Sequence, residues 1–344
     1  MTASLDELFF DAPLLAIESS CDETSAAVVI GRQVRSNVIA SQIAMHAEWG
    51  GVVPEAAARA HVEAILPVIA SALSDAGISR SEVGAIAVTN RPGLVGALSV
   101  GVTAAKALAF ALRVPLIGVH HIEGHLSSLL AEPLQPEYPL IAMVVSGGHT
   151  ELALMESPLR YRLLGATRDD AAGEALDKSA RLIGLGYPGG RALEELARGG
   201  NPKGYPLPRA LGSNTFEMSF SGLKTAVLRT VEKAGDSLNR EDLAASAQSA
   251  VVDVLVARVG RALDLFPARG IGVVGGVASN SALRSGLQAL ADRRGVPFLA
   301  PDRSLCTDNA GMIGLAGSLR LGAGARDGLE LETVASAPLP GLVE

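Results

Sequence analysis

The stretch VHHIEGHLSSLL, residues 119–130, places three histidines and a glutamate within six positions. On a helix with 3.6 residues per turn, His121 and His125 lie about 40° apart around the axis and share one face. Two imidazoles on one face can bind a single metal ion. The alternative is that both are ordinary buried histidines at a junction between a strand and a helix.

The glutamate in this stretch decides against a protease. A zinc protease of the H-E-x-x-H type needs its glutamate directly after the first histidine, where it reaches the metal-bound water. Ile122 occupies that position, and Glu123 lies about 200° around the helix from His121. The inverted order H-x-x-E-H fails too, because Gly124 separates Glu123 from His125. The spacing is therefore compatible with a metal pair and excludes this protease class.

Two histidines need at least one more ligand, usually a carboxylate. Asp308, in the segment CTDNAG, is the best candidate, and it stands where a helix is expected to begin. The competing interpretation is that Asp308 caps that helix, a position that aspartate fills very often. Cys306 is a softer alternative ligand, although a buried thiol is the plainer reading.

Turns rich in glycine and hydroxyl groups follow three apolar strands: SSCDET (19–24), SGGHT (146–150) and GGVASN (275–280). Such turns let backbone N–H groups approach phosphate oxygens. Asp22 and Glu23 in the first turn are placed to coordinate a cation or accept a proton, which makes them the candidate catalytic residues. The sequence lacks G-x-x-x-x-G-K-[ST], so this is not a P-loop protein.

The elements that must position these residues form a repeated pattern. LLAIESSCDETSAAVVI, from Leu14, and LIAMVVSGGHTELALM, from Leu140, each read as strand, polar turn and strand, and helices follow each pair. Residues 93–112 read as a helix in which Gly93, Ala97, Gly101 and Ala105 form a small-residue stripe. That stripe lets another backbone approach this helix closely. The duplication predicts two similar α/β lobes that face each other across a cleft.

The bulk composition narrows the function classes. The chain has 344 residues, 48% of them hydrophobic and 3% aromatic, with a net charge of −7, which argues against a general nucleic-acid binder. Two cysteines make no disulfide framework, so a reducing cytoplasm is expected. The first residues lack a basic segment typical of a signal peptide. Residues 94–119 read as a buried helix and a strand, so we expect no membrane span.

Several motifs occur in order over residues 14–317: IESSCDET, GGVVPE, PGLVGAL, HHIEGHL, VSGGHT, DDAAGEALDKSARLIGLGYPGG, SFSGLKT, GGVASN and CTDN. This set resembles the universal tRNA threonylcarbamoyladenosine transferase family, in its bacterial branch. The resemblance implies an α/β fold of the actin-like ATPase type, with two ribonuclease-H-like lobes around a central cleft. We expect the lobes at 12–125 and 126–308, a helix near 309–322 packing back on the first lobe, and a tail at 323–344.

The resemblance also implies a reaction: transfer of threonylcarbamoyl from threonylcarbamoyl-AMP to the exocyclic amine of adenosine 37, in tRNAs that read codons starting with A. It implies one divalent metal per chain held by His121, His125 and Asp308, with iron expected and zinc as the alternative, and ATP, ADP or threonylcarbamoyl-AMP in the cleft. The positions that match substrate contacts are Val144, Val145, Ser146, Gly147, Gly148, Asp177, Gly190, Glu194 and Asn280. Implied partners are tRNA, a paralogous actin-like subunit (TsaB) and a small P-loop ATPase (TsaE).

Three departures from the family pattern leave the ligand side chains intact. Arg91 stands where glycine is expected before PGLVG, Leu176 replaces a phenylalanine, and Ser279 replaces the commoner alanine. An acidic chain that binds tRNA needs a local basic patch or a partner. Candidate residues for such a patch are Arg91, Arg160, Arg162, Arg168, Lys178, Arg181, Lys203 and Arg209. Rival functions are carbamoyl transfer to another acceptor and a non-catalytic, nucleotide-binding regulatory subunit.

Overall fold

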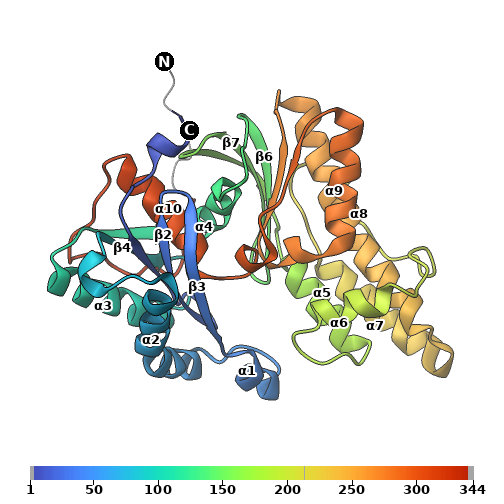
Figure 1. Cartoon of the computed structure of the whole chain (residues 1–344). Coiled ribbons are helices and arrows are strands. Elements are labelled where there is room, and N and C mark those ends of the chain that lie inside the picture. The colour runs from blue at the N-terminus through green and yellow to red at the C-terminus, as the bar shows by residue number, and fades with distance from the viewer. Residues whose placement is uncertain (1–3, 213, 340–344) are drawn as a thin grey trace.

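The computed structural model describes residues 4–212 and 214–339. The chain forms two five-stranded sheets with helices on their faces, and the two sheets lie in separate lobes (Figure 1). The strand order is β3-β2-β1-β4-β5 in the first sheet and β10-β9-β6-β7-β8 in the second. If five is added to each strand number of the first sheet and the list is read from its other end, it gives the strand order of the second sheet. The duplicated arrangement predicted from the two hairpin sequences is therefore present.

The first sheet contains β1 (Leu14–Glu18), β2 (Glu23–Ile30), β3 (Gln33–Ser41), β4 (Ala85–Arg91) and β5 (Leu116–His120). β1 is antiparallel to β2 and parallel to β4. Side chains alternate between the two faces of a strand. Leu15 and Ile17 therefore pack under α2 (Pro54–Ala76) and α3 (Val95–Leu112), while Leu14 and Ala16 pack against α10 (Ala310–Gly322).

The second sheet contains β6 (Leu140–Val145), β7 (Thr150–Ser157), β8 (Arg160–Ala166), β9 (Ile271–Val274) and β10 (Phe298–Leu299). One face supports the main core with α5 (Ala172–Leu182), α6 (Gly190–Ala197), α7 (Ser221–Ala234), α8 (Arg240–Leu265) and α9 (Ser281–Arg294). The other face packs against α4 (His121–Ser127) through Leu140, Ala142 and Val144. α4 thus lies between the two sheets, where it contacts both β6 and α10.

The remaining elements are short. They are α1 (Ile43–Trp49) and the 3₁₀ turns η1 (Asp6–Leu8), η2 (Arg80–Glu82), η3 (Ser128–Leu130), η4 (Gly235–Ser237), η5 (Gly276–Ser279) and η6 (Arg303–Leu305). The small-residue stripe packs inside the chain: Ala97 O accepts a hydrogen bond from Ser19 Oγ, and a Cβ on Gly93 would lie 2.5 Å from Ser20 O. The stripe therefore lets α3 approach the first polar turn closely.

The chain after α10 is irregular, as expected for a loop, but it is bound along the edge of the first sheet. Asp327 N donates to Leu116 O, and Val334 N donates to Asn90 O. His120 Nε2 lies 3.1 Å from Ala337 O. Leu339 is buried in the cluster between α4 and the second sheet. The tail therefore follows β5 to its carboxyl end and reaches the space between the lobes.

Three helices, α2, α3 and α8, are long and apolar enough to cross a membrane by length and composition. In this structure α2 and α3 pack on the first sheet and α8 packs on the second. The segment 94–119 is a helix followed by the buried strand β5, as predicted from its sequence.

Candidate metal centre and substrate cleft

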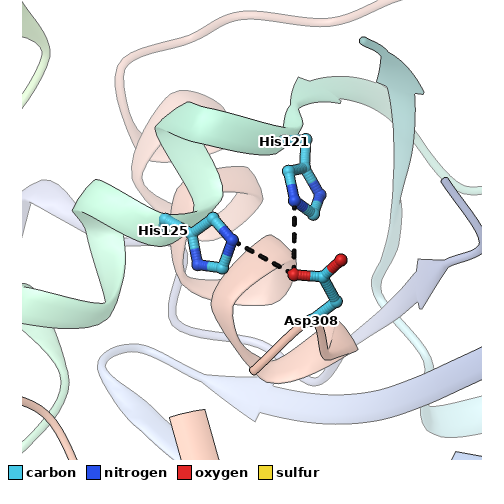
Figure 2. Close-up of side chains that lie close together, drawn as sticks. All are labelled: His121, His125 and Asp308. Atoms are coloured by element: carbon cyan, nitrogen blue, oxygen red, sulfur yellow. Dashed lines mark ion pairs between the residues drawn. The ribbon is translucent and has the colours of Figure 1, made fainter. Parts of the chain in front are cut away.

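The side chains of His121 and His125, on α4, and of Asp308, just before α10, come together (Figure 2). Asp308 Oδ1 lies 3.4 Å from His121 Nε2 and 3.2 Å from His125 Nε2. Two atoms that each lie about 2.1 Å from one tetrahedral metal are about 3.4 Å apart. The three side chains therefore have the spacing of ligands that share an ion.

His125 supplies a separate test of that fit. Its side chain is fully buried, and neither ring nitrogen makes a well-directed hydrogen bond among residues 4–212 and 214–339, although Asp308 Oδ1 approaches Nε2 to 3.2 Å. Buried polar atoms without partners are rare because losing water costs free energy that nothing returns. A metal ion bound at Nε2 would satisfy one of these atoms. The structure thus contains a possible metal site, and the donor set of two imidazoles and a carboxylate suits iron or zinc.

His121 is oriented by a residue that the sequence analysis did not single out. Glu18, at the end of β1, places its carboxylate 3.1 Å from His121 Nδ1, and Ser20 Oγ lies 3.3 Å from the same nitrogen. Glu18 is fully buried and also accepts a hydrogen bond from Thr89. A carboxylate on Nδ1 holds a proton there and leaves Nε2, on the side of Asp308, as the nitrogen available to a metal ion. The available signal was an acidic residue ending an otherwise apolar strand.

The structure also decides between the two readings of Asp308. The cap of α10 is Asn309, whose Oδ1 accepts a hydrogen bond from Met312 N. Asp308 does not fill that position, and its side chain turns instead to the two histidines. Cys306 is buried and lies against the carbonyl oxygens of Pro301 and Asp302.

The charges at this centre compensate each other. Burial alone would raise the pKa of Asp308, but His121 and His125 outweigh it and hold that pKa well below its usual value. Burial would lower the pKa of His121, yet Asp308 and Glu18 raise it well above the ordinary range. Burial lowers the pKa of His125, which favours the neutral imidazole that a metal requires.

Glu123 has a structural role. It is buried beside α10, where its Oε2 accepts a hydrogen bond from Arg320 Nη1 at 3.0 Å. The carboxylate therefore ties α4 to α10 and lies outside the histidine cluster. This ion pair explains why an acidic residue sits inside HHIEGHL without a role at the metal.

The first polar turn leads from β1 toward the cleft. His61 of α2 holds it in place, with Nε2 3.1 Å from Cys21 O and Nδ1 2.7 Å from Thr24 Oγ1. Glu23 accepts a hydrogen bond from Ser41 Oγ, while its Oε2 is buried without a partner in the described part of the chain. Burial and the neighbouring Asp22 raise the pKa of Glu23 to about 8. Glu23 is therefore mostly neutral at pH 7.

The second polar turn faces the candidate metal ligands from the other lobe. Val144 and Val145 are fully buried at the end of β6, and Ser146 closes the turn by receiving a hydrogen bond from His149 N. The His149 ring lies 6.1 Å from the His121 ring, centroid to centroid. Gly147 and Gly148 are exposed, and a Cβ at either would meet nothing within 4 Å. Open space and free backbone donors are thus present at this turn.

The other predicted substrate contacts line the second lobe. Asp177 Oδ1 accepts hydrogen bonds from Gly189 N and Gly190 N, both at 2.8 Å, and burial raises the pKa of Asp177. Glu194 Oε1 accepts a hydrogen bond from Ser281 N at 2.9 Å. Asn280 caps α9 by accepting from Leu283 N. Gly190 therefore uses its N–H inside the chain, and Glu194 is already bonded to the start of α9.

Several candidate basic residues are neutralised by acids. Arg160 pairs with Glu156, Arg168 with Glu217, Arg209 with Asp253, and Lys178 with both Asp170 and Glu174. Arg91 is only partly exposed and donates to Asn90. A cavity of about 590 Å³ lies at the opposite end of β5 from the histidines, lined in part by Phe110, Arg113 and Asp327.

A protein-family model and several curated proteins match this sequence. The family model TsaD, tRNA N6-adenosine threonylcarbamoyltransferase, matches residues 33–315. The chain belongs to this family. It is 55% identical over 316 residues to the tRNA N6-adenosine threonylcarbamoyltransferase of Moorella thermoacetica, covering 90% of this chain and 92% of the relative. It is 53% identical to the same-named protein of Symbiobacterium thermophilum, covering 93% and 95%. As a TsaD family member, the chain is a transferase that modifies tRNA, which confirms the expectation from its motifs.

Solved structures confirm the fold class. The T. kodakarensis HypF structure aligns with a TM-score of 0.62 at 15% identity, covering 91% of this chain and 48% of that one. Component A of the Acidaminococcus fermentans (R)-2-hydroxyglutaryl-CoA dehydratase aligns at 0.55 and 14% identity, covering 91% and 100%. At these identities the likeness concerns the fold alone. The TsaD chain therefore has the actin-like ATPase fold that its motifs implied.

Proposed function

We propose that this TsaD chain transfers threonylcarbamoyl from threonylcarbamoyl-AMP to adenosine 37 of tRNA at the centre between its two lobes. The observation that carries the proposal is the approach of His149, in the second polar turn, to within 6.1 Å of His121, a predicted metal ligand in the first lobe. A donor bound there touches the metal ligands from one lobe and free backbone N–H groups from the other.

The donor is already activated, because the threonylcarbamoyl group is joined to phosphate in a mixed anhydride. Attack by the adenosine amine forms the new C–N bond, breaks the C–O bond to phosphate and releases AMP. A divalent metal on His121, His125 and Asp308 would supply a Lewis acid for the donor's oxygens, with Fe²⁺ as our assignment and Zn²⁺ as the alternative. Gly147 and Gly148 offer backbone N–H groups to the phosphate or to the developing oxyanion. Val144, Val145 and Ser146 hold that turn at the end of β6.

The second lobe orients the rest of the donor. Asp177 has one oxygen bonded to Gly189 and Gly190, so its other oxygen is the one we assign to a donor hydroxyl. Gly190 acts by fixing Asp177, while Asn280 and Glu194 position the start of α9 beside the adenylate. Correct orientation of two reactants can supply roughly 7–11 kcal/mol of a barrier. Positioning is thus the main contribution of these side chains.

The acceptor amine must lose a proton during transfer. Glu23 is mostly protonated at pH 7, so it is better suited to donate a proton than to accept one. We therefore assign Asp22 as the proton acceptor, with Glu23 as its neutral neighbour. Asp22→Asn should lose transfer activity while it still binds threonylcarbamoyl-AMP. Unchanged single-turnover transfer by this variant would remove Asp22 from the chemistry.

Partner proteins fit an apolar face of the first lobe. Val62 and Leu66 project from α2 and Phe110 from α3, and Phe110 is 72% exposed. Exposed apolar side chains on two packed helices suit a protein interface, and we assign this face to the paralogous subunit TsaB. TsaE and tRNA complete the proposed assembly. We place the enzyme in the cytoplasm, where tRNA is found.

The decisive experiment combines the purified chain, threonylcarbamoyl-AMP, TsaB, TsaE and unmodified tRNA, followed by mass spectrometry of the nucleosides. The wild type should form threonylcarbamoyladenosine, and His121→Ala should not. Asp302→Asn is a matched control, because Asp302 lies in the same loop as Asp308 but only caps η6. Absence of the modified nucleoside with the wild type would overturn the proposal.

A further inference from the structure

Trp49 is the only tryptophan of the chain, and 53% of its surface is exposed. It ends α1. Ile43, the first residue of α1, and Val53, just before α2, are also exposed. Burying a large aromatic ring is favourable, so an exposed tryptophan indicates a surface that another molecule covers. The function proposed above does not use this residue.

Trp49 is tied to the first polar turn by a short series of contacts. Gln42 N donates to Asp22 O at 3.0 Å, and the Gln42 side chain lies 3.1 Å from His46 Nε2. His46 is fully buried and packs edge-on against Trp49, with ring centroids 5.8 Å apart. The indole ring therefore has a defined place relative to Asp22.

The second lobe approaches the same point. Arg181 Nη2 donates to Gly50 O, at the residue after Trp49, over 3.0 Å. Arg181 lies on α5, one turn after Asp177. Figure 1 shows α1 at the end of the first lobe that faces α5 and α6. The segment that carries Trp49 and Gly50 in the first lobe is therefore joined to α5 of the second lobe by Arg181.

We propose that Trp49 stacks on an unpaired base of the tRNA anticodon loop next to the acceptor adenosine, with Arg181 beside the adjoining phosphate. This inference rests on the proposed function. An adenosine whose amine enters the cleft leaves the stack of its loop, and its neighbour then exposes a free face. Proteins bind such bases by stacking them on aromatic side chains and by placing arginine along the backbone.

The position of Trp49 favours RNA over a protein partner. The face assigned to TsaB is formed by Val62, Leu66 and Phe110 on the long helices α2 and α3. Trp49 instead adjoins the turn that carries Asp22 and a guanidinium from the opposite lobe. Because Gln42 contacts Asp22 and Arg181 contacts Gly50, this surface adjoins the proposed site, whose acceptor substrate is an RNA.

The single tryptophan gives a direct measurement. An unmodified anticodon stem-loop RNA should quench the fluorescence of the isolated chain, and an RNA abasic at the two positions flanking adenosine 37 should bind with weaker quenching. In the complete assembly, Trp49→Ala should raise KM for tRNA about tenfold, leave kcat within about twofold and leave donor binding unchanged. Trp49→Phe should restore most of the loss, because it keeps an aromatic face.

Leu265→Ala is the matched control, since it removes a similarly exposed apolar side chain from the end of α8 and should leave KM for tRNA unchanged. The inference is overturned if Trp49→Ala matches the wild type in KM, or if RNA binds by anisotropy without a change in fluorescence. Quenching by TsaB or TsaE but not by RNA would assign the surface to a protein and would also overturn it. If the wild type forms no threonylcarbamoyladenosine, the proposed function itself fails, so the two failures are distinguishable.

Discussion

The Glu18 carboxylate faces His121 Nδ1 at 3.1 Å, on the side of the imidazole away from Asp308. A carboxylate in this position fixes the tautomer and the ring orientation that metal binding needs. Glu18→Ala should therefore weaken metal affinity about 10- to 100-fold. Competition with a chelator measures this directly. Glu55→Gln, an exposed substitution on α2, is the control, and equal metal affinities for both variants would contradict the assignment.

Asp308 and Asn309 are neighbours with separable roles. Asp308→Asn should abolish metal binding, because it removes the charged ligand, while α10 keeps its cap. Asn309→Ala should lower the free energy of unfolding by about 1 kcal/mol, since it removes a side-chain cap. It should still bind metal. Metal analysis and chemical denaturation on both variants test this, and loss of metal from Asn309→Ala with Asp308→Asn intact would reverse the roles.

Glu23 predicts a pH dependence of stability. Its pKa is about 8 in the folded chain, above the usual glutamate value of 4.5, so folding favours the protonated form. Below pH 4.5 Glu23 is protonated in both the folded and the unfolded chain, so it does not change the free energy of unfolding. The folded state then loses stability as the pH rises from 4.5 toward 8. Glu23→Gln removes this loss, so its Tm relative to the wild type should increase between pH 5 and pH 8. Parallel Tm curves for the two proteins would show that Glu23 ionises normally.

Gly147 and Gly275 predict opposite outcomes for the same substitution. A Cβ on Gly147 meets nothing within 4 Å, so Gly147→Ala should fold normally. Its methyl group would occupy space proposed for the donor, so we expect KM for threonylcarbamoyl-AMP to rise about tenfold through displaced hydrogen bonds. Gly275 has φ +92°, and its Cβ would lie 2.4 Å from Val145 O.

Gly275→Ala should therefore lower Tm clearly, whatever it does to activity. Thermal unfolding and donor titration on both variants separate the two effects. A destabilised Gly147→Ala, or a Gly275→Ala as stable as the wild type, would contradict this account of the turns.

The sequence by itself determined the local elements and the fold class. The order of apolar strand, polar turn and apolar strand occurs twice, and it predicted two hairpins. These hairpins are β1–β2 and β6–β7. Helical periodicity placed His121 and His125 on one face and turned Glu123 away. These predictions succeed because side-chain direction repeats with a fixed period in helices and strands. That period can be recognised in the order of apolar and polar residues. The motifs then identified the family.

Only the tertiary structure decided which distant side chains meet. Glu18 lies 103 positions from His121, and Glu123 lies 197 positions from Arg320. Asp308 was equally a cap or a ligand by spacing, and the cap went to Asn309. The tail read as a simple loop, yet it follows β5 into the space between the lobes. Gly50 and Arg181 meet because the lobes face each other. Such contacts depend on how whole layers pack, and no local period in the sequence records that.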